Sequence, residues 1–191
     1  MVLAVTPALP AAAAGATGTD SQVAAEEKAR DYFSNLEVID QDGQTLHFYD
    51  DVLKDKVVAI NFIFTNCQGA CPLMTRNMTL VRDLLGSDIG GKIHFVSISI
   101  DPVRDTPAAM KEFAETHDAN QDGWSWITGN PENLAHIVKK LGSYTDDVEA
   151  HTTMVLAANV RTAHWTKIPP NVPPNGIVER LRLLAEEDAA N

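Results

Sequence analysis

The stretch VVAINFIF, residues 57–64, decides the fold, because it is an almost continuous apolar run of strand length. Such a run is typical of a central strand that is buried on both faces of a sheet. A helical pattern follows over residues 72–85, and a second apolar run comes after it at residues 93–100. The three segments predict a strand–helix–strand unit with parallel strands, which is typical of an α/β protein.

Further expected elements surround this unit. Strand-like runs at residues 36–39 and 46–49 flank the turn-like sequence DQDG, so we expect an N-terminal β-hairpin. Thr106-Pro107 and Asn130-Pro131 each place a capping side chain before a proline, which is typical of helix N-termini. The remaining expected elements are strands at residues 124–128, 153–157 and 162–166, a proline-rich loop at 168–174 and a closing helix at 177–187.

Length and composition limit the classes of protein. A chain of 191 residues has room for one domain with some extra sequence. Its 45% hydrophobic and 21% charged residues are typical of a globular protein. The net charge of −11 argues against a nucleic-acid partner, because a phosphate backbone requires clustered Lys and Arg. We therefore expect no nucleic acid among the partners.

Residues 1–30 differ from the rest of the chain, and we expect them to be a leader before a single domain over residues 31–191. Residues 1–25 contain no Lys or Arg, and they include the small-residue run AAAAGA. This composition is similar to the end of an export signal, although the basic start is missing and prolines interrupt the apolar segment. A truncated signal and a disordered leader both stay open as interpretations.

The chemistry concentrates at the two cysteines, Cys67 and Cys71. Cys67 follows a predicted buried strand and Cys71 enters a predicted helix, at the strand end where open α/β sheets bind ligands. This spacing lets both sulfurs bind one metal ion or form a disulfide, and the helix N-terminus favours thiolates. A structural disulfide or a pair of buried thiols is the alternative, but so short a loop adds only about 2 kcal/mol. Common dithiol oxidoreductases have two intervening residues, so the spacing of three favours a metal.

A copper site needs a third ligand, and His151 is the candidate among six histidines. It follows an acidic loop at residues 142–150 and precedes a predicted strand. Two thiolates and one imidazole suit copper, whereas structural zinc requires a fourth protein ligand. From spacing alone, a solvated histidine stays the alternative. Asp101 follows the predicted strand at residues 93–100, where it borders the same crevice or starts a turn.

The other candidates favour structural roles. Met74 and Met78 lie four residues apart, which suits core packing as well as soft copper ligation, and we predict that they belong to the core. We expect solvated or hydrogen-bonded imidazoles at His47, His94, His117 and His136.

Three motifs in order resemble the Sco/SenC family over residues 32–187. They are FIFTNCQGACP at residues 62–72, SISIDPVRDTP at residues 97–107, and His151-Thr152. The resemblance implies a thioredoxin-like α/β fold, with a central mixed sheet flanked by helices and an added N-terminal β-hairpin. It also implies one copper ion per chain, Cu(I) or Cu(II), held by Cys67, Cys71 and His151. Asp101 matches the Asp-Pro motif that the family has near this site.

The same resemblance implies a function at the binuclear copper site of cytochrome c oxidase, either supplying copper or reducing its cysteines. The implied partners are the copper-site subunit of that oxidase or another copper protein, and a thioredoxin-like reductant. The implied location is the periplasm after export, with a membrane anchor in the full-length form. Gln68 and Ala150 depart from the family pattern, which often has proline after the first cysteine and aspartate before the histidine.

Three functions stay open at this point. A copper chaperone must hold copper and release it by ligand exchange, which an exposed thiolate site of low coordination number allows, and we favour it. A thiol–disulfide oxidoreductase would use Cys67 as the attacking thiolate and Cys71 as the resolving thiol, without any need for His151. A redox sensor or a peroxide-reducing protein would begin with a low-pKa cysteine that forms a sulfenic acid.

Overall fold

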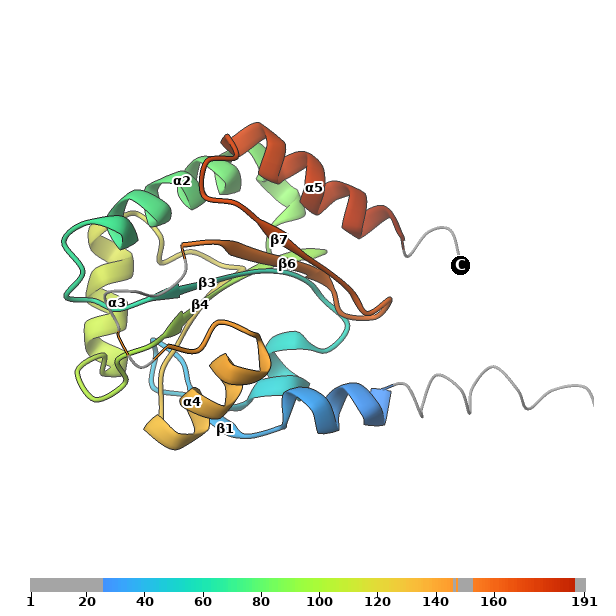
Figure 1. The fold of residues 1–191 in the computed structure, drawn as a ribbon. Helices are drawn as coiled ribbons and strands as arrows, with labels where there is room; N and C mark the ends of the chain where they lie inside the picture. The colour runs from blue at the N-terminus through green and yellow to red at the C-terminus, as the bar shows by residue number, and fades with distance from the viewer. Residues whose placement is uncertain (1–25, 146, 148–152, 188–191) are drawn as a thin grey trace, which may run out of the picture.

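The computed structural model describes residues 26–145, 147 and 153–187. Its centre is a five-stranded mixed sheet with the strand order β5-β4-β3-β6-β7 (Figure 1). Strands β3, β4 and β5 are parallel, whereas β6 is antiparallel to both β3 and β7. The mixed central sheet is therefore confirmed. The strands are β3 (Val57–Ile63), β4 (Ile93–Ser99), β5 (Trp124–Ile127), β6 (Val155–Asn159) and β7 (His164–Ile168).

The apolar run at residues 57–63 forms the middle of this sheet, and every residue of β3 is buried. Side chains alternate along a strand, so β3 contributes to two cores. One core lies under α2 (Ala70–Leu85), α3 (Pro107–Thr116) and α5 (Pro174–Glu186). The other lies under α4 (Pro131–Lys140) and the helical turn η1 (Phe48–Leu53). Helices thus cover both faces of the sheet (Figure 1).

The expected N-terminal hairpin is present. Strands β1 (Glu37–Ile39) and β2 (Thr45–His47) pair antiparallel, and Ile39 also pairs with Thr128 beyond the end of β5. The buried carboxylate of Asp40 holds the turn by accepting hydrogen bonds from the backbone N–H groups of Asp42 and Gln44. Strand β2 is shorter than predicted, because the chain turns into η1 directly after His47.

Both predicted helix caps are confirmed. Thr106 Oγ1 accepts a hydrogen bond from the backbone N–H of Ala109, at 3.2 Å, at the start of α3. Asn130 Oδ1 accepts hydrogen bonds from two backbone N–H groups at the start of α4, the closer at 2.8 Å. In each helix the proline takes the first position, where its missing N–H costs nothing.

Several boundaries differ from the predicted ones. Helix α2 begins at Ala70, two residues before Pro72, because a proline is tolerated in the first turn of a helix. The strands β6 and β7 lie two residues later than predicted, because Asn159 stays in β6 and its Oδ1 accepts hydrogen bonds from the N–H groups of the turn that follows. Residues 26–33 are helical, and within the described residues no helix is long and apolar enough to cross a membrane.

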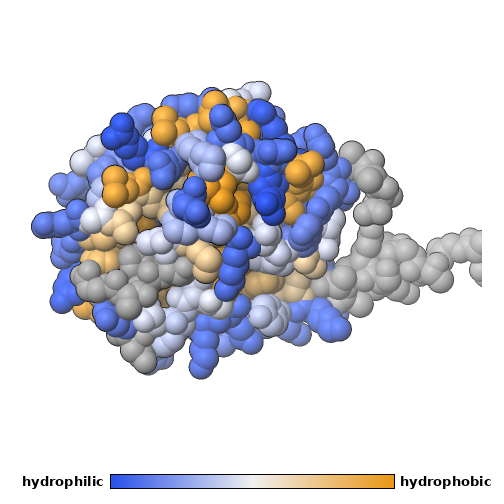
Figure 2. Space-filling view, turned by 45° about the horizontal axis from the view of Figure 1, so that its top comes forward, coloured by the Kyte–Doolittle hydropathy of each residue, from blue (hydrophilic) through white to orange (hydrophobic). Residues whose placement is uncertain are grey.

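Helix α2 presents one apolar stripe to the core and a second to solvent. Met74, Met78, Val81 and Leu85 are buried, which confirms the two methionines as core residues. Leu73, Leu80 and Leu84 lie on a neighbouring face that is turned to solvent, 45–65% exposed. Figure 2 shows hydrophobic side chains on this face of the molecule, over α2 and α5.

Candidate metal centre

The two cysteines lie where the predicted strand–helix unit places them. Cys67 follows β3, and its backbone N–H donates to the carbonyl of Phe64 at 3.1 Å. Cys71 lies in the first turn of α2 and is only 1% exposed, whereas Cys67 is partly exposed. The backbone N–H of Cys71 donates to Cys67 Sγ at 3.4 Å. Neither cysteine forms a disulfide, so the structure shows the reduced form of the pair.

The surroundings of the two sulfurs separate their pKa values. Burial raises the pKa of Cys67, but hydrogen bonds from the backbone N–H and the thiol of Cys71, and from the backbone N–H groups of Gly69 and Ala70, outweigh it and leave that pKa lowered. Burial raises the pKa of Cys71 to about 12, and the neighbouring Cys67 and Asp105 act in the same direction. Cys67 therefore ionises more readily than Cys71, and Cys71 keeps its proton at neutral pH in the metal-free protein.

Asp105 joins the cysteine loop to the ends of the neighbouring strands, although it lies 34 residues beyond Cys71. It is 1% exposed. Its Oδ1 accepts hydrogen bonds from the backbone N–H and the hydroxyl of Thr65, at 2.9 and 2.7 Å, and its Oδ2 accepts from Ser99 Oγ at 2.5 Å. Its backbone carbonyl accepts from Thr128 Oγ1 at 2.5 Å. One buried carboxylate thus orders the backbone two residues before Cys67.

Of the other two predicted site residues, the structure describes Asp101 but not His151. Asp101 lies after β4, and its carboxylate pairs with Arg104 at 2.7 Å, while its backbone N–H donates to Ser99 Oγ at 3.1 Å. Its role beside a metal stays a prediction. His151, the predicted third ligand, lies outside the described residues. Within the described part of the chain, no group of three His, Cys, Asp or Glu side chains could hold a metal ion.

A small hollow lies behind Cys71, between β3 and α2. It contains about 190 Å³ of free space and is too narrow for a water molecule. Three sulfur-bearing side chains, those of Cys71, Met74 and Met154, contribute to its wall. Among the residues that the structure describes, the lining consists of Asn61, Phe62, Ala70, Cys71, Met74, Thr153 and Met154.

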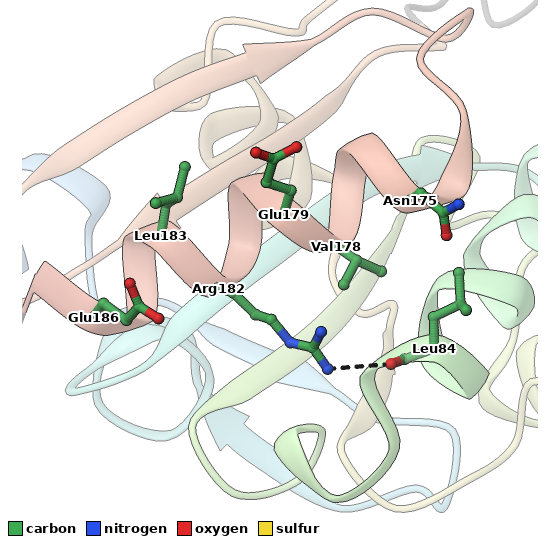
Figure 3. Close-up of a pocket in the computed structure, with 7 residues that line it drawn as sticks. All are labelled: Leu84, Asn175, Val178, Glu179, Arg182, Leu183 and Glu186. Atoms are coloured by element: carbon green, nitrogen blue, oxygen red, sulfur yellow. Dashed lines mark hydrogen bonds between the residues drawn. The ribbon is translucent and has the colours of Figure 1, made fainter.

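Larger hollows lie away from the cysteines. The groove between α2 and α5 is lined by Leu84, Val178 and Leu183 together with polar side chains (Figure 3). There Arg182 donates to the carbonyl of Leu84 at 3.2 Å and pairs with Asp88 at 3.0 Å. The charged side chains of this groove make ordinary surface contacts. We therefore place the candidate site at the two cysteines and not in the groove.

Two residues of the site were not predicted from the sequence. Asp105 stands among several acids in a loop motif, and nothing in its spacing indicated that its carboxylate reaches Thr65. Asn61 was part of the apolar run that predicted the central strand. A single polar residue inside a run that is buried on both faces was the available signal, because such a residue needs a partner.

Comparison with known proteins identifies the family. The sequence model of the SCO1/SenC family matches residues 24–186 of this chain. The SCO1 protein homolog of Bacillus subtilis is 39% identical over 90 residues, which cover 47% of this chain and 45% of the relative. The curated relatives are thus matched over about half of their length.

Two solved structures extend the comparison to the fold. The SCO1/SenC family lipoprotein of Bacillus anthracis matches with a TM-score of 0.69 and 30% identity, over 79% of this chain and 93% of that one. The copper-bound ScoI of Bradyrhizobium japonicum matches with a TM-score of 0.64 and 25% identity, over 78% and 96% of the two chains. The family profile spans the sheet, both cysteines and the helices around them, and the chain belongs to the SCO1/SenC family.

Proposed function

We propose that this protein is a copper-binding metallochaperone that delivers copper to the binuclear copper site of cytochrome c oxidase. The observation that carries the proposal is the reduced thiol pair at the N-terminus of α2, in which Cys67 is partly exposed with a lowered pKa and Cys71 is buried in the first turn. Copper is the cargo. Thiolates are soft ligands that select Cu(I) and also bind Cu(II), so the donor set fits either state.

The expected ligands are Cys67, Cys71 and His151, with one copper ion per chain. The partly exposed Cys67 is the ligand that a partner can reach first, which suits release by ligand exchange. Among the relatives, a protein of Stutzerimonas stutzeri that is 33% identical over 107 residues is described as a putative copper-binding protein, and the Bradyrhizobium japonicum structure holds copper. These names support copper as the metal.

The proposed partner is the copper-site subunit of cytochrome c oxidase or another copper protein, with a thioredoxin-like reductant that keeps the thiols reduced. We also propose that the protein works outside the cytoplasm, in the periplasm, and is membrane-anchored in its full-length form. The Bacillus anthracis relative is a lipoprotein, which supports export and anchoring.

Thiol–disulfide exchange is a second candidate function, because one observation favours it specifically. The partly exposed Cys67 has a lowered pKa, as expected of an attacking thiolate, and the buried Cys71 has a raised pKa, as expected of a resolving thiol. In this function the protein would reduce the cysteines of a copper-site partner. His151 would then be dispensable.

An anaerobic titration of the reduced protein with Cu(I) and Cu(II) separates the two functions. We expect one tightly bound equivalent, with a thiolate-to-copper charge-transfer band for Cu(II), and loss of this binding in both Cys67→Ser and His151→Ala. The His151→Ala variant should keep its dithiol exchange with a small disulfide. A wild-type protein that binds no stoichiometric copper but still cycles to a disulfide would overturn the chaperone proposal in favour of the reductase.

A further inference from the structure

Buried polar atoms without partners point to a residue that the proposed site leaves unused. Within the described residues, three buried side-chain atoms make no hydrogen bond, namely Asn61 Nδ2, Thr75 Oγ1 and Ser143 Oγ. An unpaired buried donor costs free energy, so each such atom requires an explanation. Of the three residues, only Asn61 lines the hollow behind Cys71.

Neighbouring hydrogen bonds set the orientation of the Asn61 amide. Ser97 Oγ donates its single proton to Asn61 Oδ1, at 2.8 Å, and accepts the indole N–H of Trp124 at 2.9 Å. If the amide were flipped, the Ser97 hydroxyl would lose its acceptor. Asn61 Oδ1 is therefore the atom on Ser97, and the two N–H donors of Nδ2 point away from it.

The strand places these donors on the side of the sheet where Cys71 lies. Ala59 and Ile63 belong to the core under α2, and Asn61 shares their side because side chains alternate along β3. Asn61 is 2% exposed, and it shares the hollow with Cys71, Met74 and Met154. Because the hollow is too narrow for a water molecule, no water pairs with the amide there.

The metal-free thiol is a poor acceptor, but the copper-bound form of Cys71 is a good one. To bind copper, Cys71 releases its thiol proton to solvent and its sulfur forms a bond to the metal, with no change in oxidation state. The sulfur then carries negative charge, and hydrogen bonds to charged acceptors are stronger than those to neutral ones. The thioethers of Met74 and Met154 are only weak acceptors, so this thiolate is the strongest sulfur acceptor in the wall.

We propose that Asn61 is a positioning residue for the metal site, whose Nδ2–H donates to Cys71 Sγ when that sulfur holds copper. This inference rests on the proposed copper-binding function. The hydrogen bond would orient the buried ligand and draw electron density from it, as partners of metal ligands do at other sites. In the metal-free protein the Asn61 Nδ2–H donors have no acceptor, and copper binding would supply one at Cys71 Sγ.

The first test uses the wild-type protein. Cu(I) is diamagnetic, so the side-chain amide signals of a ¹⁵N-labelled sample remain visible after loading, and an Asn61 variant assigns the relevant pair. We expect one Asn61 Nδ2 proton to move downfield when one equivalent of Cu(I) binds. A bound protein in which both protons keep their metal-free positions would overturn the inference.

The second test removes the donor. Asn61→Leu should lower the Cu(I) affinity about tenfold, the smaller effect typical of lost partners of metal ligands, as measured by competition with a chromophoric Cu(I) chelator. It should also move the thiolate-to-Cu(II) charge-transfer band to longer wavelength, because a thiolate without its hydrogen bond is a stronger electron donor. A change in folding alone would not shift this band. Should the leucine variant not fold, Asn61→Ser serves for the same two readouts.

Thr75→Val is the matched control. Thr75 Oγ1 is also buried and unpartnered, but Thr75 does not line the hollow, so its replacement should leave the copper affinity and the band unchanged. Equal affinities and bands in wild type and the Asn61 variant, with copper still lost in His151→Ala, would overturn the role of Asn61 alone. A wild-type protein without stoichiometric copper would instead overturn the proposed function.

Discussion

Helix α2 borders two hollows of opposite character. The hollow at its N-terminus contains about 190 Å³ of free space, whereas the groove that it forms with α5 contains about 730 Å³, and both volumes include space open to solvent. The larger space is lined by exposed leucines and by an arginine whose charge is paired with Asp88. The smaller one adjoins a buried thiol and an amide without an acceptor.

The difference shows that size does not locate the chemistry of this molecule. At the small hollow, the Asn61 amide lacks an acceptor and the Cys71 thiol has a raised pKa. A metal ion that displaces the thiol proton would leave a sulfur that can accept a hydrogen bond. The groups of the large groove already have partners or face water. Perturbed and unpaired atoms are therefore a better guide to the site than open volume.

The largest expected effect is the contrast between the two thiols. In Cys71→Ser, Cys67 should react with iodoacetamide at a lower pH than an ordinary thiol, because its lowered pKa raises the thiolate fraction at a given pH. In Cys67→Ser, burial should still keep the pKa of the remaining Cys71 raised and its sulfur shielded, so it should react roughly a hundredfold or more slowly at pH 8. Alkylation followed by mass spectrometry measures both rates, and similar rates would contradict the asymmetry.

Asp105→Ala should produce the next largest effect. The substitution leaves the N–H and hydroxyl of Thr65 and the hydroxyl of Ser99 without their acceptor, so we expect the free energy of unfolding to fall by about 3 kcal/mol. Urea unfolding of the metal-free protein measures it. Asp101→Ala is the matched control, since that carboxylate pairs with an exposed arginine, and it should change the stability much less. An equal loss in both variants would count against the role of Asp105.

The strand and helix periodicity of the sequence predicted the frame of this site well. The apolar run at residues 57–64 became the central strand, and the capping residues Thr106 and Asn130 began two helices as expected. These features depend on local patterns that the sequence carries directly. The cysteines were placed correctly for the same reason, because each lies at an end of a predicted element.

The rest of the site depends on contacts between distant segments. The carboxylate of Asp105 reaches Thr65 across 40 positions of sequence, and no periodicity encodes this contact. The two apolar stripes of α2 show a similar limit. The stripe that begins at Met74 and the stripe that begins at Leu73 have the same helical spacing in the sequence, yet only the first faces the sheet. The choice between them depends on packing against β3 and α5, which a single helix pattern does not contain.

In the groove, removing a charge should have a small effect. Arg182→Gln deletes the contacts to Asp88 and to the carbonyl of Leu84, at 3.0 and 3.2 Å, but the side chain is 49% exposed. We expect the free energy of unfolding to fall by less than about 1 kcal/mol, because water and salt screen such pairs. Urea unfolding at low and high salt measures this. The alkylation rate of Cys67 should not change, and a change in it would mean that the groove and the dithiol are coupled.

The smallest effect is expected for Leu183→Ser, which separates an exposed apolar surface from a packed one. Leu183 is 54% exposed and lines the groove, so its replacement removes little buried area. The free energy of unfolding should stay within about 0.5 kcal/mol of the wild type, in contrast to the Asp105→Ala loss at the other end of α2. A loss above about 1 kcal/mol by urea unfolding would show that the groove leucines belong to the core, and the contrast between the two hollows would then rest on the dithiol and its buried partners alone.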